Sequence, residues 1–333
     1  MKISLHLRPC SARSSGLCFR SRSAPLLAVL VLGIMAVGPA WAEALLWTNI
    51  TGGNWNVAAN WEPNRVPASG DEVVITNAGT YTVTLNANAS PSRLTLGAES
   101  GIQTLAIPGP TLTVQTEAWV IGNGVLALSG GTLTGAGTLT VSNVMSWTEG
   151  TMSGGGATVI AAGATLNISG SAQKNLNQRT LRNFGTAVWS GAGKIYVQNR
   201  APFYNEAGGV FEVRNDVGYE QQSGGEVGSI HNAGLFRKSA GAGTTTIETP
   251  VHNTGTISVW SGTLNFSRSL TLGPTTTFEF GLAGPSQTGN YGRITCAQPI
   301  QIVGHLAVTF VGAFLPDAGE DYPVIVAPIR GAI

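Results

Sequence analysis

Charged side chains are scarce in this 333-residue chain. Lys and Arg total 18 and Asp and Glu total 17, so charged residues make up 11% of the sequence, against roughly 25% in an average soluble domain. A nucleic-acid-binding protein needs a basic face, which such a chain cannot build. Disordered proteins are poor in apolar residues, whereas 43% of this chain is hydrophobic. We therefore expect a folded core and no nucleic-acid partner.

Cysteine is also scarce, and its placement excludes a disulfide framework. Two of the three Cys residues lie in the N-terminal segment that we interpret below as a signal peptide. The remaining Cys296 cannot form an internal disulfide, so the fold does not depend on one. No His lies near Cys296 in the sequence, and free Cys usually packs inside a protein. We therefore predict a buried small hydrophobic residue rather than a catalytic thiol.

Residues 1–42 have the composition of a secretory signal peptide. They contain five basic residues and no acidic one, followed by an apolar stretch from Ala24 to Gly38 and by small residues at Ala40 and Ala42. We predict cleavage after Ala42 and a secreted, extracellular or cell-surface protein with no integral membrane span in its mature chain. An uncleaved anchor is the alternative, although a membrane span needs about 20 apolar residues. The mature chain then carries a net charge of −4.

Glycine and short alternating runs are what the sequence has in abundance. Gly occurs 45 times, about twice the usual ~7%, and no convincing stretch after Glu43 has helical periodicity. Runs of three to five residues instead alternate apolar side chains with Thr, Ser or Asn, which is typical of half-buried strands. These runs include Tyr81–Leu85, Thr111–Val114, Thr138–Val141, Thr165–Ile168 and Thr263–Phe266. The pattern predicts an all-β protein with many tight turns.

A diverged repeat runs through the middle of the chain. Asn183, Asn205, Asn232 and Asn253 each lie close to a Gly and precede an apolar strand, at spacings of 22, 27 and 21 residues. Repeats of this length indicate a solenoid, and the Asn side chains can stack and satisfy each other from coil to coil. We predict a right-handed parallel β-helix of roughly a dozen rungs. A β-sandwich is the alternative, but it needs hairpin turns that are rare here.

The two ends of the solenoid differ from its middle. Residues 43–106, which contain three Trp, are predicted to form an N-terminal β cap, because solenoids need atypical terminal units to close the core. Residues 107–272 are predicted to form the solenoid rungs. Residues 273–333 lack the short runs separated by glycine and are predicted to form a C-terminal β unit, with strands at 306–310 and 322–326.

The N-terminal residues also resemble a known family. Trp47, Asn49, Gly53, Trp55, Asn60, Trp61, Pro67, Asp71, Val73 and Ile75 form the pattern W-x-N…G-x-W…N-W…P…D-x-V-x-I. This pattern resembles the opening module of bacterial secreted β-helix proteins of the autotransporter-passenger-like and filamentous-haemagglutinin-like kind. Residues 236–264 resemble their internal rungs, and residues 304–322 resemble their closing unit. The resemblance implies a bacterial surface protein with an adhesin-like role; how it is attached to the cell is left open.

Two groups of residues are candidates for binding. Trp47, Trp55 and Trp61 could form an aromatic platform for sugar rings, or they could plug the end of the solenoid. His231 and His252 each precede the Asn of a repeat, so they could stack on adjacent rungs as a metal pair. The alternative is that the repeat was simply copied, because no Cys or carboxylate completes a four-ligand set. We predict no metal and no cofactor.

No catalytic constellation is evident. Glycoside hydrolysis usually needs two facing carboxylates, and the mature chain has only four Asp, well separated apart from Asp317 and Asp321. With Glu320 these two form an acidic trio whose spacing matches no full calcium loop. The leading hypothesis is a non-catalytic adhesin that binds a polysaccharide, matrix or cell-surface glycan. A polysaccharide lyase or glycoside hydrolase is the second hypothesis, and a structural spacer or fragment of a larger protein is the third. The oligomeric state is left open.

Overall fold

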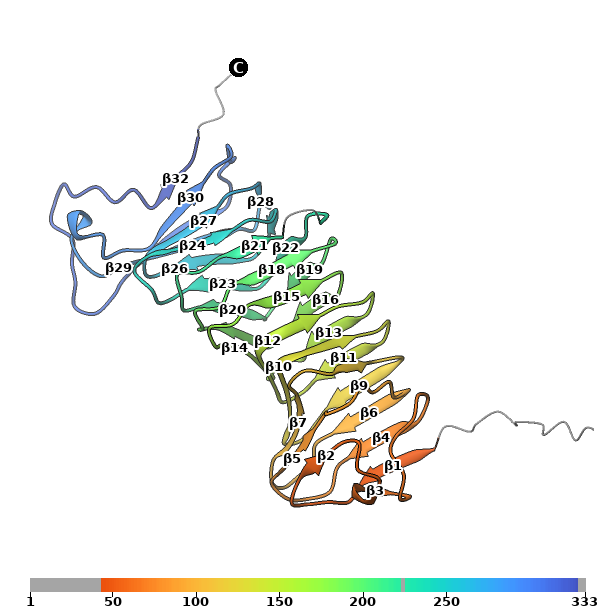
Figure 1. Ribbon diagram of the computed structural model, residues 1–333. Helices are drawn as coiled ribbons and strands as arrows, with labels where there is room; N and C mark the ends of the chain where they lie inside the picture. Colours follow the sequence, from red (N-terminus) through yellow and green to blue (C-terminus); the bar gives the residue numbers. More distant parts are fainter. Residues whose placement is uncertain (1–42, 223–224, 329–333) are drawn as a thin grey trace, which may run out of the picture. The chain divides into compact units, whose positions relative to one another are not determined.

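The computed structural model describes residues 43–222 and 225–328. The predicted signal peptide lies outside the described residues. The described chain is an all-β parallel solenoid of about ten coils, and each coil consists of short strands linked by corners (Figure 1). Three walls of parallel strands enclose one core. Among the described residues, no helix is long and apolar enough to cross a membrane.

The first wall is a twelve-stranded sheet, in which each coil contributes one parallel strand and β3 is an additional strand at the N-terminal edge. All its neighbours pair in parallel, apart from the antiparallel pair that β3 forms with β1. Its strands, in chain order, are β1 (Ala44–Trp47), β3 (Trp61–Glu62), β4 (Glu72–Ile75), β6 (Arg93–Leu96), β9 (Glu117–Val120), β11 (Thr138–Val141), β13 (Ala157–Ile160), β16 (Thr180–Asn183), β19 (Pro202–Asn205), β22 (Ser229–Asn232), β25 (Val251–Asn253) and β28 (Leu270–Leu272).

The second and third walls are joined, because two long strands run along both of them. β10 pairs with β7 in the second wall and with β8 in the third, and β12 follows the same path. The second wall contains β2 (Gly53–Asn54), β5 (Tyr81–Thr84), β7 (Gln103–Ile107), β10 (Gly124–Thr134), β12 (Val144–Met152), β14 (Thr165–Ile168), β17 (Thr186–Trp189), β20 (Val210–Val213), β23 (Leu235–Lys238), β26 (Thr256–Val259), β29 (Thr277–Leu282) and β31 (His305–Phe310). The third wall adds β8 (Thr111–Thr113), β15 (Lys174–Asn177), β18 (Ile195–Gln198), β21 (Tyr219–Gln221), β24 (Thr244–Ile247), β27 (Thr263–Phe266), β30 (Arg293–Cys296) and β32 (Ile325–Val326). Two short 3-10 helices, η1 (Ala58–Asn60) and η2 (Ser286–Thr288), lie at corners.

Alternating side chains explain why these short runs become strands. In β11, Leu139 and Val141 are completely buried, whereas Thr138 and Thr140 face outward. Successive side chains of a strand point to opposite faces, so the apolar residues of each coil stack on those of the next. The alternating runs identified from the sequence coincide with β5, β8, β11, β14 and β27. The all-β solenoid prediction is thereby confirmed.

The four repeat Asn residues form a ladder inside the solenoid. The side-chain amide nitrogen of Asn183 donates to the side-chain oxygen of Asn205 over 2.8 Å. Asn205 donates to Asn232 over 2.7 Å, and Asn232 donates to Asn253 over 2.6 Å. The last amide donates to the hydroxyl of Thr276 over 3.1 Å. Stacking of these side chains from coil to coil is confirmed, and it fixes the corner after each first-wall strand.

The N-terminal end of the solenoid is closed by three indole rings. Trp61 packs edge to face against Trp47 and against Trp55, with centroids 4.9 Å apart in both pairs. β3 covers the outer edge of β1 and so ends the first wall. The coils continue through the two boundaries expected near residues 107 and 273, because β7 pairs with β10 and β26 pairs with β29.

The C-terminal end has a different character. In the part of the chain that the structure describes, β31 pairs only with β29, and β32 pairs only with β30. Leu306, Val308 and Phe310 continue the inward column of β29, yet they are 57%, 44% and 48% exposed, because no further coil within the described residues covers them. The strand expected at 322–326 is shorter than predicted and reduces to Ile325–Val326.

Candidate functional site

One outward-facing residue from each of four successive coils forms a line on the first wall. Arg182, Tyr204, His231 and His252 each immediately precede a ladder Asn. Because the Asn points inward, the residue before it points outward. Strand pairing places Arg182 beside Tyr204, Tyr204 beside His231, and His231 beside His252. We call these four residues the ring column.

The planar groups of the ring column are stacked. The Tyr204 and His231 rings have centroids 4.7 Å apart and planes 18° apart. The His231 and His252 rings are 4.9 Å and 15° apart. The guanidinium carbon of Arg182 lies 5.7 Å from the centroid of the Tyr204 ring. The fold therefore presents three nearly parallel rings on its outer surface, with the guanidinium group of Arg182 next to the first of them.

Polar groups flank the ring column. Arg182 forms a salt bridge with Glu206 over 2.6 Å, and the Ser229 hydroxyl lies 3.0 Å from Nε2 of His231. The pKa of His231 is lowered by partial burial and by the neighbouring His252 charge, against a smaller opposing effect of Glu206. A hollow of about 160 Å³ opens along Tyr204, Glu206, His231 and His252. The site thus combines ring faces with hydrogen-bonding groups.

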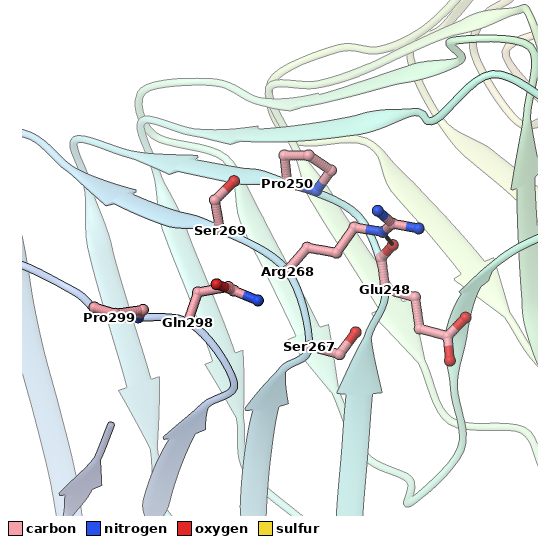
Figure 2. Close-up of a pocket in the computed structure, with 7 residues that line it drawn as sticks. All are labelled: Glu248, Pro250, Ser267, Arg268, Ser269, Gln298 and Pro299. Carbon is pink, nitrogen blue, oxygen red and sulfur yellow. Dashed lines mark hydrogen bonds between the residues drawn. The ribbon is translucent and has the colours of Figure 1, made fainter. Parts of the chain in front are cut away.

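A larger hollow lies at a corner further along the solenoid. It has a volume of about 690 Å³ and occupies the corners after β24, β27 and β30, where the chain leaves the third wall (Figure 2). We call it the corner groove; its lining residues are Glu248, Pro250, Ser267, Arg268, Ser269, Gln298 and Pro299. Arg268 Nε donates to the backbone oxygen of Glu248 over 2.8 Å.

The ring column leads toward the corner groove. His252 pairs with Thr271 of β28, which continues the line of the ring column by one coil. Thr271 lines a third hollow of about 270 Å³, and this hollow shares Ser269 and Pro299 with the corner groove. The ring column and the corner groove are therefore joined along one surface of the solenoid.

The three predicted Trp candidates lie elsewhere. Trp47, Trp55 and Trp61 are 0%, 1% and 1% exposed, and the indole nitrogen of Trp61 donates to the backbone oxygen of Trp55 over 2.8 Å. Such rings have no open face on which a sugar could stack. Their burial is the arrangement that the plug interpretation requires.

The two His residues meet as the repeat spacing predicts, but nothing in the described structure completes a metal site. No group of three or more His, Cys, Asp or Glu residues suited to a metal ion occurs within residues 43–222 and 225–328. The acidic trio near Glu320 is also no such group; Glu320 accepts a hydrogen bond from the Tyr322 hydroxyl over 2.8 Å. Cys296 is buried as predicted, and burial raises its thiol pKa to about 11.

Arg182, Tyr204 and Arg268 did not appear as candidates in the sequence. A signal for the first two exists, because both precede a repeat Asn in the same way as the two His residues. No comparable signal marks Arg268, since the corner groove is built from corners of three different coils.

Comparisons of the chain with protein-family models, with curated proteins and with solved structures gave no match. The parallel solenoid is compatible with the resemblance to bacterial β-helix surface proteins. One fold supports many functions, so function has to be argued from the surface itself.

Proposed function

We propose that this β-solenoid is a secreted, non-catalytic protein that binds a polysaccharide or cell-surface glycan, as an adhesin does, and that the ring column is its binding platform. The observation that carries this proposal is the stack of Tyr204, His231 and His252 on the outer face of adjacent strands. Planar rings with an apolar face and a polar edge suit contact with sugars, whose rings have the same two characters.

The surroundings of the ring column support this ligand class. Arg182, Glu206 and Ser229 place charged and hydroxyl groups beside the rings, and sugar hydroxyls can donate to or accept from such groups. Each contact is weak on its own. A polymeric ligand that touches several coils adds these contacts together, because each further contact is formed within one complex.

Secretion belongs to the same proposal. It rests on the basic, apolar and small-residue regions of residues 1–42 and on the resemblance to bacterial surface proteins. A glycan-binding role is consistent with an extracellular location, where polysaccharides are exposed.

The two other hypotheses receive less support. A hydrolase normally places two carboxylates across the scissile bond, whereas Glu248 is the only carboxylate among the described residues that line the corner groove. A simple spacer needs neither stacked rings nor hollows on its outer wall. The ring column and the corner groove therefore favour binding over both alternatives.

A depletion assay tests the proposal. Purified residues 43–333 are mixed with a panel of insoluble polysaccharides and with whole cells, and loss of protein from solution is measured. We expect selective depletion, weakened about tenfold by Tyr204→Ala, since loss of a stacked ring costs about 1.4 kcal/mol. Tyr196→Ala is the matched control, because Tyr196 faces outward on β18 in the third wall, away from the ring column.

Two outcomes contradict the proposal. No depletion on any surface would remove glycan binding as the function. Equal losses with Tyr204→Ala and Tyr196→Ala would remove the ring column as the platform. The same samples are assayed for released reducing sugar, and its appearance would replace binding with hydrolysis as the function.

A further inference from the structure

Arg268 is held in the corner groove without a carboxylate partner. Its Nε donates to the backbone oxygen of Glu248 over 2.8 Å, which holds the exposed side chain along the corner. In the described part of the chain, its two terminal nitrogens form no hydrogen bond and no salt bridge with a protein group. A guanidinium group presents its donors in a rigid fork that matches the two oxygens of a carboxylate.

The one acidic side chain of the corner groove does not neutralise Arg268. The Glu248 carboxylate accepts a hydrogen bond from the backbone nitrogen of Gln221 over 3.2 Å. Figure 2 shows this carboxylate pointing away from the guanidinium group of Arg268. The positive charge of Arg268 is therefore available to a ligand.

Neutral polar groups line the same groove as this charge. Ser267, Ser269 and Gln298 line the corner groove together with Arg268. Within the described residues, neither the Ser269 hydroxyl nor the Gln298 amide has a side-chain hydrogen bond. The corner groove thus offers one cation and two free neutral hydrogen-bonding groups in an open hollow of about 690 Å³, where Arg268, Ser269 and Gln298 are exposed to solvent.

We propose that the corner groove binds the carboxylate of an acidic polysaccharide built from uronic acid units. Arg268 pairs with the carboxylate through its two terminal nitrogens, and Ser269 and Gln298 bond to hydroxyl groups of the same sugar. Hydrogen bonds between ionised partners are roughly twice as strong as neutral ones, so the charged pair sets the specificity. This inference rests on the proposed function, and it names the class of glycan.

The shape of the surface would allow one polysaccharide chain to contact both the ring column and the corner groove. The hollow beside Thr271 connects the end of the ring column to the corner groove through Ser269 and Pro299. Neighbouring strands lie about 4.8 Å apart, so a polymer that follows the wall meets one coil after another. Sugars on the ring column then supply stacking, and a uronate in the corner groove supplies the charged contact.

A binding experiment tests the pairing directly. Isothermal titration calorimetry at pH 7 and 150 mM salt compares polygalacturonate with its methyl ester, which lacks the negative charge, and with sulfated dextran. We expect the acid to bind at least about tenfold more tightly than the ester. Arg268→Gln is expected to abolish that difference, and Arg268→Lys to retain part of it, because Lys keeps the charge without the fork. Circular dichroism and urea midpoints establish that both variants are folded.

Arg93→Gln is the matched control, because it removes the same charge from an exposed site at the start of β6. An equal loss of affinity in this control would overturn the proposal in favour of bulk electrostatic attraction. Sulfated dextran bound as tightly as polygalacturonate would overturn the carboxylate assignment. Equal affinity for acid and ester, with both still weakened by Tyr204→Ala, would overturn the corner-groove proposal and leave the ring column as the platform. Binding of no polysaccharide would overturn both proposals.

Discussion

Asn205 donates a hydrogen bond to the side-chain oxygen of Asn232 over 2.7 Å in the interior of the solenoid. The same bond recurs from coil to coil, so the ladder has a direction. At its start, the Asn183 side-chain oxygen has no hydrogen-bond partner in the described residues. At its other end, Asn253 donates to Thr276. Each interior Asn is therefore both donor and acceptor, and neighbouring coils depend on one another.

Asn205→Ala is expected to destabilise the solenoid by about 2–4 kcal/mol. The change leaves the Asn232 side-chain oxygen without its donor and removes the acceptor of Asn183, and each buried unsatisfied group costs about 1–3 kcal/mol. Urea unfolding followed by circular dichroism measures the loss. Asn175→Ala, on the outer face of β15, is the control and is expected to change stability by less than about 0.5 kcal/mol. Equal effects would mean that the ladder is not a source of stability.

Much of this arrangement could be predicted from the sequence because the repeat is regular. The spacing of the Asn residues predicted the length of a coil, and the Gly close to each Asn predicted the position of a corner. The alternation of apolar and polar side chains predicted which residues of each strand point into the core. The stack of His231 on His252 follows from the same register. Local pattern and three-dimensional position agree wherever one coil is a copy of the previous one.

Side chains at corners that contact residues far away in the sequence could not be predicted in this way. Arg179 lies in a turn, where a long charged side chain normally reaches solvent, yet it is completely buried. It donates to the Thr158 hydroxyl and to four backbone oxygens, those of Gly135, Gly137, Ser153 and Ala157. Contacts to residues that precede it by up to 44 positions leave no local signal in the sequence. The corner groove fails to appear in the sequence for the same reason.

Arg179→Leu is expected to destabilise the protein by about 3 kcal/mol or more, because five buried acceptors on neighbouring coils lose the hydrogen bonds that the guanidinium group donates. Burial lowers the pKa of this guanidinium to about 10, but the group remains charged at neutral pH. Arg179→Lys is expected to recover only part of the loss, since one ammonium group cannot reach acceptors on two coils. Urea midpoints at pH 7 check both variants. Arg93→Leu serves as an exposed control, and a loss of the same size there would contradict the assigned role.

His231 is expected to make the solenoid less stable at mildly acidic pH than at neutral pH. Its folded pKa is lowered below the ordinary value of 6.5 by burial and by His252, while Glu206 acts in the opposite direction. The unfolded chain therefore binds the proton more readily, so stability is fully present above pH 6.5 and is lost as pH falls through the lower folded pKa. Urea midpoints between pH 7.5 and 5 are compared with those of His231→Gln, which is expected to lose less stability. Nuclear magnetic resonance titration of His231 above pH 6.5 would contradict this prediction.

Cys296 is expected to make the solenoid less stable at alkaline pH. Burial raises its thiol pKa from 9.0 to about 11, so the folded state holds the proton more tightly than the unfolded state. The associated stability is fully present below pH 9 and is lost as pH rises through 11. Other groups titrate in this range, so the measurement is the difference in pH dependence between the wild-type protein and Cys296→Val. Parallel curves for the two proteins, or fast thiol labelling of the native state at pH 8, would contradict the buried thiol.

Trp61 is expected to stabilise the end of the solenoid and to have no part in glycan binding. Its ring packs between Trp47 and Trp55 at 4.9 Å from each, so Trp61→Ala removes a fully buried side chain, at a cost of about 3–5 kcal/mol. Trp119→Ala, on the outer face of β9, is the control with a smaller expected loss. Trp61→Phe keeps an aromatic ring, and we expect the folded variant to be depleted by polysaccharide as the wild-type protein is. A Trp61→Phe protein with the wild-type urea midpoint but no depletion would place the sugar at the Trp cluster instead of the ring column.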